Sequence, residues 1–323
     1  MLAFVMIRAA KIRMGIEVRN INDYCLHGVS TIVTVGMFDG LHVGHRSIVA
    51  SLNAKASELG LKPIVVTFDK HPRQVLGASD FRLLTTLDER LDLLDSCGAE
   101  SVALIQFTPQ VAQLSACQFV EQYLLTHLNM GALVLGYDNM FGNKAHNDFD
   151  HISDLAESSH FKIFHESPVF YQDQYAVSST KVRHAIAEGD VERANAMLGY
   201  RYKIQGIVVH GREVGRTIGF PTANVDMSDS EKMLPQEGVY AAEARIADGT
   251  SYMAMVNIGP QPTFGLTRPT VEVHLLDFDG DLYDSVLRVD FLCRLRNVCR
   301  FDSKEQLIEQ LVADREAVRT AFK

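Results

Sequence analysis

Residues 36–45 read GMFDGLHVGH, and the first half of the chain is organised around this stretch. A β-rich run, TIVTV at 31–35, precedes it, and a helical pattern that begins near His45 follows it. Its three glycines let the backbone turn tightly and approach a ligand closely. A strand, a glycine-rich turn and a helix N-terminus together predict a phosphate site, because free amide groups and the positive end of the helix dipole point to one place. His42 and His45 would add imidazole donors there.

The pattern on both sides of this stretch predicts strands that alternate with helices. The expected strands are 31–36, 62–68, 101–106, 132–135 and 161–165, and the expected helices are 45–59 (ended by Gly60), 87–96, 115–128, 178–187 and 190–198. This alternation is typical of an α/β, doubly wound parallel sheet. Ligands of such sheets bind beyond the carboxyl ends of the strands. The four loops 36–45, 68–73, 107–110 and 136–142 should therefore share one pocket.

After about Tyr200 the chain changes to short strands separated by turns. The expected strands are 202–210, 238–247, 251–258, 270–278 and 281–293. Asp279-Gly280 between the last two predicts a hairpin, and an amphipathic helix is expected over about 303–321. These features predict a small all-β barrel with a terminal helix, and a domain boundary near 187–200.

Composition limits the possible partners. The chain has 323 residues, enough for two domains, and its net charge of −9 argues against broad nucleic-acid binding. Its five cysteines are odd in number and have no CxxC spacing, which indicates reduced thiols rather than a disulfide framework or a zinc site. No apolar run approaches the ~18 residues of a membrane span. We therefore expect a cytoplasmic protein, a monomer or weak homo-oligomer, with no membrane or nucleic-acid partner.

The first thirteen residues, MLAFVMIRAAKIR, are basic and contain no acidic residue. Their basic part follows the apolar part, which is the wrong order for a secretory signal, although another kind of targeting segment stays open. We expect a frayed extension or an early start site, with the working chain beginning near Met14.

The densest motif of the second half is GREVGRTIGFPTAN at 211–224. Its glycines make a loop whose amides could cover phosphates. Thr222 and Asn224 are two residues apart, so in an extended chain both side chains point to one side. Hard oxygen donors of this type suit a Mg²⁺ ion carried by a nucleotide. A surface turn rich in glycine and proline is the alternative.

Glu272 lies in the β-run VEVH at 271–274, on the same face as His274. A carboxylate that faces a pocket could take a proton from a hydroxyl nucleophile. The alternative is the solvent-facing side of an amphipathic strand.

Residues 178–183, SSTKVR, open a predicted helix. Serine and threonine there could simply cap the helix, or Lys181 and Arg183 could grip a leaving pyrophosphate. His71 and Arg73 in the loop after 62–68 could face a ligand pocket or solvent.

Taken together, these motifs resemble the bacterial bifunctional riboflavin kinase/FAD synthetases, from about Met14 to the end of the chain. The stretches that carry the resemblance are GMFDGLHVGH, FDKHP, LGYDNMFG, SSTKVR, VVHGREVGRTIGFPTAN, GVYAAEA, VNIGPQPTFG, VEVHLLDFDGDLYD and LRNVCRFDS. The HxGH element alone would indicate only the wider nucleotidyltransferase superfamily, whereas the GRxxGFPTAN block is close to specific for riboflavin kinases.

The resemblance implies two domains and two reactions. The domain at 200–323 would use Mg²⁺ and ATP to phosphorylate the ribityl 5′-hydroxyl of riboflavin, giving FMN. The nucleotidyltransferase domain at 14–187 would let the FMN phosphate attack the α-phosphorus of a second ATP, giving FAD and pyrophosphate. The alternatives are one surviving activity, more readily the kinase, or a non-catalytic flavin or nucleotide sensor.

The resemblance also implies roles for individual residues. In the kinase domain, Glu272 would be the general base, Thr222 and Asn224 would hold the metal and phosphate, and the nucleotide would be covered by Gly211, Gly215, Arg216, Gly219 and Pro221. In the other domain, His42 and His45 would stabilise the transferring phosphate, with ATP contacts from Gly36, Phe38, Asp39 and Gly44. The pyrophosphate would meet Ser179, Thr180 and Arg183, and the flavin or metal side would be formed by Phe68, His71, Arg73 and Asp138.

Overall fold

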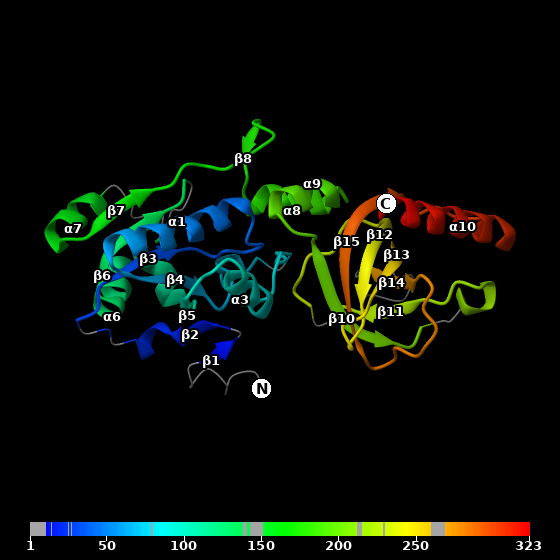
Figure 1. The fold of residues 1–323 in the computed structure, drawn as a ribbon, viewed down its shortest axis with the longest axis horizontal. Helices are drawn as coiled ribbons and strands as arrows, with labels where there is room; N and C mark the ends of the chain where they lie inside the picture. Colours follow the sequence, from blue (N-terminus) through cyan, green and yellow to red (C-terminus); the bar gives the residue numbers. More distant parts are fainter. Residues whose placement is uncertain are drawn as a thin grey trace. The chain divides into compact units, whose positions relative to one another are not determined.

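The structure is a computed structural model that describes residues 11–13, 15–24, 26, 28–78, 80–137, 141–142, 151–211, 215–228, 230–259 and 269–323. The chain divides into two compact units, Met1–Ser178 and Ser179–Lys323 (Figure 1). This division falls before the boundary of 187–200 expected from the sequence, so the two helices around that boundary belong to the second unit. In the described part of the chain, no helix is both long and apolar enough to cross a membrane.

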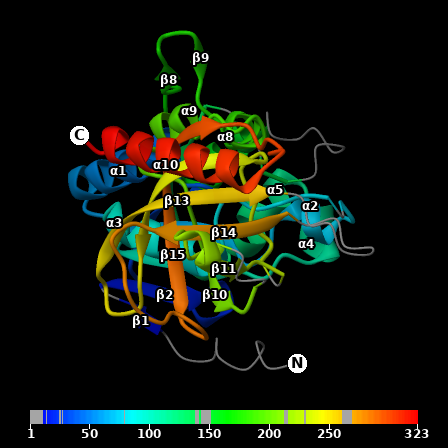
Figure 2. The same cartoon turned by 90° about the vertical axis from the view of Figure 1, so that its right-hand side faces the viewer.

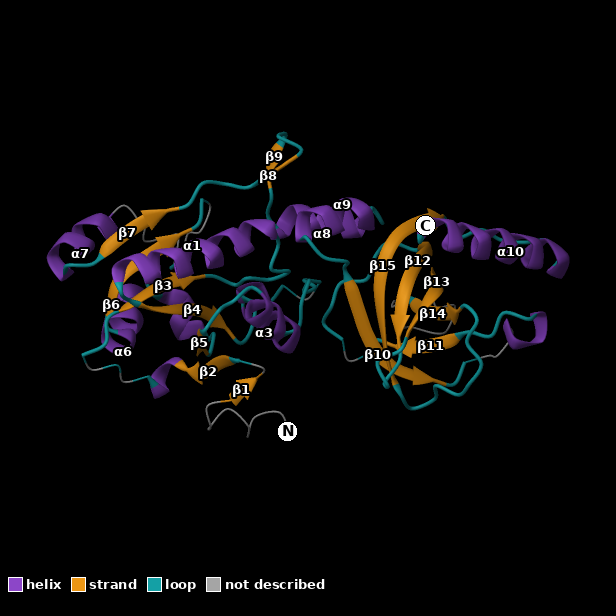
Figure 3. Cartoon of the chain, in the orientation of Figure 1, coloured by secondary structure: helices purple, strands orange, loops and turns teal. Residues whose placement is uncertain are grey.

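The first unit is built on a sheet. Its described strands are β1 (Lys11–Arg13), β2 (Ile16–Asn20), β3 (Thr31–Val35), β4 (Lys62–Phe68), β5 (Ser101–Ile105), β6 (Met130–Leu135) and β7 (Lys162–His165). They lie in the order β1-β2-β5-β4-β3-β6-β7, and each neighbouring pair from β2 to β7 is parallel (Figure 3). The predicted parallel sheet is therefore confirmed.

The two N-terminal strands were not predicted. β1 pairs antiparallel with β2, so residues 11–13 of the expected extension are part of the sheet, while residues 1–10 lie outside the described residues. β2 in turn extends the sheet beyond β5 in parallel. The sequence signal of β2 is weak because its five residues, IEVRN, are short and interrupted by charge.

Helices accompany the strands of the first unit. They are α1 (Val43–Leu59), α2 (Pro72–Val75), α3 (Leu87–Ser96), α4 (Pro109–Gln113), α5 (Ala116–Phe119), a π-helical turn (Val120–Leu125), α6 (Thr126–Leu128) and α7 (Ile152–Ser159), with a small hairpin of β8 (Phe170–Tyr171) and β9 (Tyr175–Ala176). One face of the sheet packs against the segment from α4 to α7, with Phe119 and Leu124 in that core. α1 contacts β3, β4 and β6 through its buried Val49 and Leu52.

α1 begins at Val43, two residues before the expected start, because His42 caps it. The His42 Nδ1 atom accepts a hydrogen bond from the backbone N–H of His45 at 3.3 Å. At the other end, Gly60 has φ +65° and its N–H donates to the carbonyl of Ala56, which confirms the predicted glycine cap.

The second unit contains a closed antiparallel barrel, as predicted (Figure 2). Its strands are β10 (Lys203–Val209), β11 (Ala223–Asp226), β12 (Gly238–Arg245), β13 (Ser251–Gly259), β14 (Thr270–Leu275) and β15 (Val286–Arg296), in the order β10-β11-β14-β13-β12-β15. Val225, Val271 and Ile258 are opposed across β11, β14 and β13 and are buried, so their row faces the interior.

The predicted hairpin at Asp279-Gly280 is wrong. β14 already pairs with β11 on one edge and β13 on the other, whereas β15 pairs with β10 and β12 and so closes the barrel. The Asp-Gly turn lies in a longer connection between two strands that are not neighbours. A turn dipeptide reports a local reversal of the chain, but barrel closure decides which strands pair.

Three helices pack with the barrel: α8 (Ser179–Ala187), α9 (Val191–Leu198) and α10 (Lys304–Ala321). The Asn195 side chain on α9 donates to the carbonyl of Phe291 on β15 at 2.9 Å. The corner between α8 and α9 is tight, because a Cβ atom at Gly189 would lie 2.8 Å from the Tyr240 hydroxyl. On the outer surface of the barrel, Val318 of α10 joins an apolar cluster with Met255.

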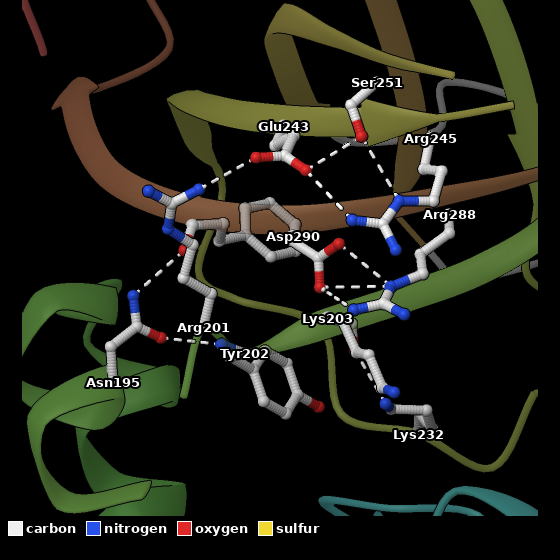
Figure 4. A network of polar contacts seen from close by, with 11 residues as sticks. Asn195, Arg201, Tyr202, Lys203, Lys232, Glu243, Arg245, Ser251, Arg288 and Asp290 are labelled. Atoms are coloured by element: carbon white, nitrogen blue, oxygen red, sulfur yellow. Dashed lines mark hydrogen bonds and ion pairs between the residues drawn. The ribbon is translucent and has the colours of Figure 1, made fainter. Parts of the chain in front are cut away.

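A network of polar contacts links side chains on β10, β12 and β15 and extends to Arg201 and Asn195, which precede the barrel in the sequence (Figure 4). Glu243 and Asp290 are directly opposed on β12 and β15, and like charges in such positions repel. Glu243 accepts hydrogen bonds from Arg201 and Arg245, both at 3.2 Å, and Asp290 accepts one from Arg288 at 2.7 Å. The arginines offset the repulsion, so we assign this network to the stability of the barrel.

Candidate functional sites

Four loops of the first unit begin at one edge of its sheet, although residues 138–140 of the last loop lie outside the described residues. They follow β3, β4, β5 and β6, which are parallel neighbours, so the predicted common edge is confirmed. Hydrogen bonds join two of these loops directly. Asp69 after β4 donates its backbone N–H to Ile105 at 3.0 Å, and its carboxylate accepts the N–H of Phe107 at 2.8 Å.

The loop after β3 has an unusual backbone. Phe38 and Leu41 have φ values of +51° and +31° and are buried. Non-glycine residues in this region are uncommon and often occur at functional sites. The flanking glycines make space for aromatic rings, because a Cβ at Gly36 would lie 3.1 Å from the Phe38 ring and a Cβ at Gly44 3.2 Å from the His42 ring.

His42 and His45 lie against each other at the start of α1. Their ring centroids are 3.7 Å apart and the rings are nearly parallel, while the Phe38 ring meets His45 edge-on at 5.2 Å. Burial, the neighbouring His42 and the charge of Arg90 hold the pKa of His45 well below its usual value. Its Nδ1 atom is buried and has no hydrogen-bond partner among the described residues. His45 is therefore neutral near pH 7 and has bonding capacity left for a ligand.

Asp39, predicted to contact ATP, forms hydrogen bonds within the protein. Its carboxylate is buried and accepts hydrogen bonds from the backbone N–H groups of Leu84 and Thr85 and from the Thr85 hydroxyl, at 2.9–3.1 Å. Thr85 also accepts the N–H of Gly40 at 3.0 Å. Asp39 thus fastens the loop to the segment before α3.

The residues expected on the flavin side lie in different structural environments. Phe68 is in the core and its ring centroid is 5.4 Å from that of Phe107. His71 caps α2 by accepting the N–H of Arg73 at 3.1 Å, and its ring lies 4.1 Å from the Phe81 ring, over which Arg73 is also placed. The sequence did not single out Phe81, and Asp138 lies outside the described residues.

Ser179, Thr180 and Arg183 lie in the first half of α8, as the predicted helix requires. α8 belongs to the second compact unit, so their role at the pyrophosphate of the first unit stays a prediction.

The second unit brings three polar side chains into one row on the outside of the barrel. Asn224 on β11 and Asn257 on β13 are both directly opposed to Glu272 on β14. Directly opposed side chains share a face and have Cβ atoms about 4.5–5.5 Å apart. All three are half-buried, and the neighbouring row faces the interior. Asn257 was not predicted as a site residue, although a lone polar residue within the apolar run MVNIG is a signal.

The glycine loop is packed against the predicted metal donors. A Cβ at Gly211 would lie 2.0 Å from the Asn224 amide nitrogen, and one at Gly215 would lie 2.2 Å from the Phe220 carbonyl and 3.5 Å from the Thr222 hydroxyl. Thr222 and Asn224 therefore both lie beside this loop, as their spacing suggested. Their oxygen atoms and the Glu272 carboxylate are the donor types that Mg²⁺ prefers.

His274 holds the segment that carries Thr222. Its Nδ1 atom is 2.7 Å from the carbonyl oxygen of Pro221, so it donates there, and its ring is 5.3 Å from that of Phe220. Burial, followed by the charge of Arg315, keeps the pKa of His274 below its usual value despite the hydrogen bond to Pro221. Pro221 is thus tied to β14 through its carbonyl group.

Arg216 and Gly219 complete the predicted covering loop. Arg216 is exposed in a 3₁₀ turn, Gly215–Ile218. Gly219 follows with φ +83°, a conformation that favours glycine. The turn leaves the Arg216 side chain on the surface, next to Gly215 in the sequence, so its role over the nucleotide stays a prediction.

Comparisons with known proteins agree with this two-unit arrangement. The sequence model of the FAD synthetase family matches residues 26–181, and that of the riboflavin kinase family matches residues 198–322. A protein from Bacillus subtilis named bifunctional riboflavin kinase/FMN adenylyltransferase is 36% identical over 90% of this chain and 92% of its own length. The chain belongs to this bifunctional family.

Other members give the same result. Relatives of the same name from Haemophilus influenzae and Escherichia coli K12 are 34% and 35% identical, each over 90% of this chain. A crystal structure described as a macrolide-efflux protein from Streptococcus pneumoniae superposes with a TM-score of 0.81 at 32% identity, covering 93% of this chain and 97% of its own. The two-unit fold is therefore that of a solved protein along nearly its whole length.

Proposed function

We propose that this chain makes FMN and then FAD at two separate sites. The second unit transfers the γ-phosphate of ATP to the ribityl 5′-hydroxyl of riboflavin, and the first unit joins FMN to the AMP part of a second ATP. Both family matches and the bifunctional relatives support this function. The observation that carries it is that each unit has its own set of groups suited to one step: the stacked His42–His45 pair in one and the Asn224–Glu272 row in the other.

In the kinase step, Glu272 accepts the proton of the ribityl hydroxyl while the hydroxyl oxygen bonds to the γ-phosphorus and the bond to ADP breaks. The substrate is ATP with Mg²⁺, which neutralises charge on the phosphate oxygens when it is bound. Thr222 and Asn224 are the residues that would hold it, and the glycine loop beside them would cover the phosphates. Catalysis then rests on positioning and on charge stabilisation.

In the adenylyl step, an oxygen of the FMN phosphate bonds to the α-phosphorus of ATP, and pyrophosphate leaves. No proton has to be removed from the nucleophile. The free amides at the start of α1 and the rings of His42 and His45 would stabilise the charge on the transferring group. The Nδ1 atom of His45 forms no hydrogen bond with the described residues, so this ring keeps unused bonding capacity.

We further propose that the protein works in the cytoplasm as a monomer or weak homo-oligomer. The described cysteines form no disulfide bond, in keeping with a reducing compartment; they are Cys97, Cys117, Cys293 and Cys299.

The test is to incubate the purified full chain with riboflavin, ATP and Mg²⁺, and to separate the products by chromatography. We expect FMN first and FAD later, and FAD alone when FMN replaces riboflavin. FMN without FAD would remove the adenylyltransferase half. No product in either reaction would leave only a flavin-binding module. A chelator added to the same reactions should stop both steps if Mg²⁺ accompanies each ATP.

A further inference from the structure

Arg90 on α3 is a buried cation that the sequence analysis did not single out. Its side chain is almost fully buried, although arginine is rarely so unless it is paired. Its Nη1 atom donates to the carbonyl of Met37 at 2.9 Å, and its Nη2 atom donates to the carbonyl of Phe68 at 2.5 Å. These carbonyls belong to the loop after β3 and to the last residue of β4. One guanidinium therefore joins the two predicted substrate loops.

Arg90 also places a positive charge near His45. Burial lowers the pKa of Arg90 to about 10, while the nearby Asp39 and Asp69 carboxylates act in the opposite direction. The side chain is therefore charged at neutral pH. Its charge helps to lower the pKa of His45, in addition to burial and the neighbouring His42.

The two carboxylates that face Arg90 are engaged elsewhere. Asp39 accepts hydrogen bonds from Leu84 and Thr85, and Asp69 accepts them from Lys70 and Phe107. Both carboxylates therefore fix loops as well as offset the buried charge. The result is a rigid arrangement in which the planar fork of the guanidinium sets the separation of two carbonyl groups.

We propose that Arg90 is a positioning residue for adenylyl transfer: it holds the loops after β3 and β4 at a fixed separation, so that ATP on the first and the FMN phosphate on the second meet in line. This inference rests on the proposed function of the first unit. The charge of Arg90 also adds to the positive field at the phosphate site. A misplacement of about 1 Å between reacting groups can lower a rate by about 100-fold, so such a brace can matter without touching a substrate.

The test compares Arg90→Met, which loses charge and fork, with Arg90→Lys, which keeps the charge but reaches only one carbonyl. With FMN and ATP as substrates, we expect kcat of Arg90→Met to fall by about 30-fold or more while the KM for ATP changes by less than about 3-fold. The kcat of Arg90→Lys should lie between those of Arg90→Met and the parent. Riboflavin phosphorylation by the same chains should be unchanged and controls for the concentration of active chain, while the retained KM for ATP reports that the first unit is folded. Lys62→Met, at the amino end of β4, is the matched control for loss of a cation.

A second readout separates positioning from loss of folding. Removing the Arg90 charge should raise the pKa on the acid side of the pH profile of FAD formation, since His45 then faces only His42, while Arg90→Lys should keep the profile of the parent. Arg90→Met with the kcat and pH profile of the parent would overturn the inference. So would a fall in FAD formation that comes entirely from lost ATP binding. A parent protein that makes no FAD would instead overturn the proposed function.

Discussion

Asn224 on β11 and Glu272 on β14 are directly opposed on neighbouring strands of the barrel, with both side chains on its outer surface. The carboxamide of Asn224 also fills the space that a side chain at Gly211 would need. The proposed base therefore lies opposite one proposed metal donor, which in turn packs against the proposed phosphate loop. The strand register brings together residues that are distant in sequence, and each can be changed separately.

Glu272→Gln should lower the rate of FMN formation from riboflavin by about 100-fold or more, because the amide cannot accept the hydroxyl proton. FAD formation from added FMN should remain, since it occurs in the other unit. The measurement is product formation in two parallel reactions, one started with riboflavin and one with FMN. An equal fall in both reactions would show that the assignment to two sites is wrong.

Asn257 should influence the proton affinity of Glu272, because it is opposed to Glu272 on the side away from Asn224. Asn257→Asp places a like charge beside the base and should raise the pKa on the acid side of the kinase pH profile. Asn257→Ala should raise it less, through loss of an amide donor. The kinetics of FMN formation between pH 5 and pH 9 measure the shift. Identical pH profiles for the parent and the two variants would show that Asn257 does not affect the pKa of Glu272.

Gly211→Ala should reduce kinase activity without unfolding the barrel. The new Cβ would overlap the Asn224 carboxamide, which must then turn away, whereas Gly211 itself is exposed. We expect a fall in kcat of about 10-fold or more, with an unchanged melting temperature. Gly131→Ala is the control, because its nearest neighbour would be at an ordinary 3.6 Å. An alanine at 211 that retains full kinase activity would show that the loop does not need its close approach to Asn224.

The ion pair of the half-buried Arg296 with the buried Asp314 should matter for stability rather than for chemistry. Asp314 on α10 is buried and accepts hydrogen bonds from Arg296 at 2.7 Å and from Gln310 at 2.8 Å. Asp314→Asn removes the charge that Arg296 pairs with and should cost about 1.5–3 kcal/mol of unfolding free energy. Arg296→Met combined with Asp314→Leu should recover most of it. Denaturant unfolding of the parent and of these two variants measures the changes, and a double variant as unstable as the single one would refute the prediction.

The sequence predicted features that depend on local pattern. Period-two and helical runs gave the parallel sheet, the barrel and the common edge of four loops, and Gly60 gave the end of α1. What it did not predict depends on contacts between distant residues. Arg90 donates hydrogen bonds to carbonyl groups 53 and 22 residues away. Asn257 lies beside Glu272 only because of the register between β13 and β14. The hairpin error has the same cause, because barrel closure rather than the turn decides the partners of β15.

His45 should make the stability of the first unit depend on pH. Its pKa in the folded protein is well below the ordinary value of 6.5, chiefly because of burial, so the unfolded chain binds a proton first as the pH falls. The stabilising contribution is fully present above about pH 6.5 and is lost as the pH falls from there toward the folded pKa, at up to about 1.4 kcal/mol per pH unit. His45→Gln should remove this part of the slope, whereas His165→Gln, at an exposed position on β7, should not. Urea unfolding between pH 7.5 and pH 5 tests this. A slope that is equal in the parent and in His45→Gln would mean that the ring can become charged in the folded state without cost.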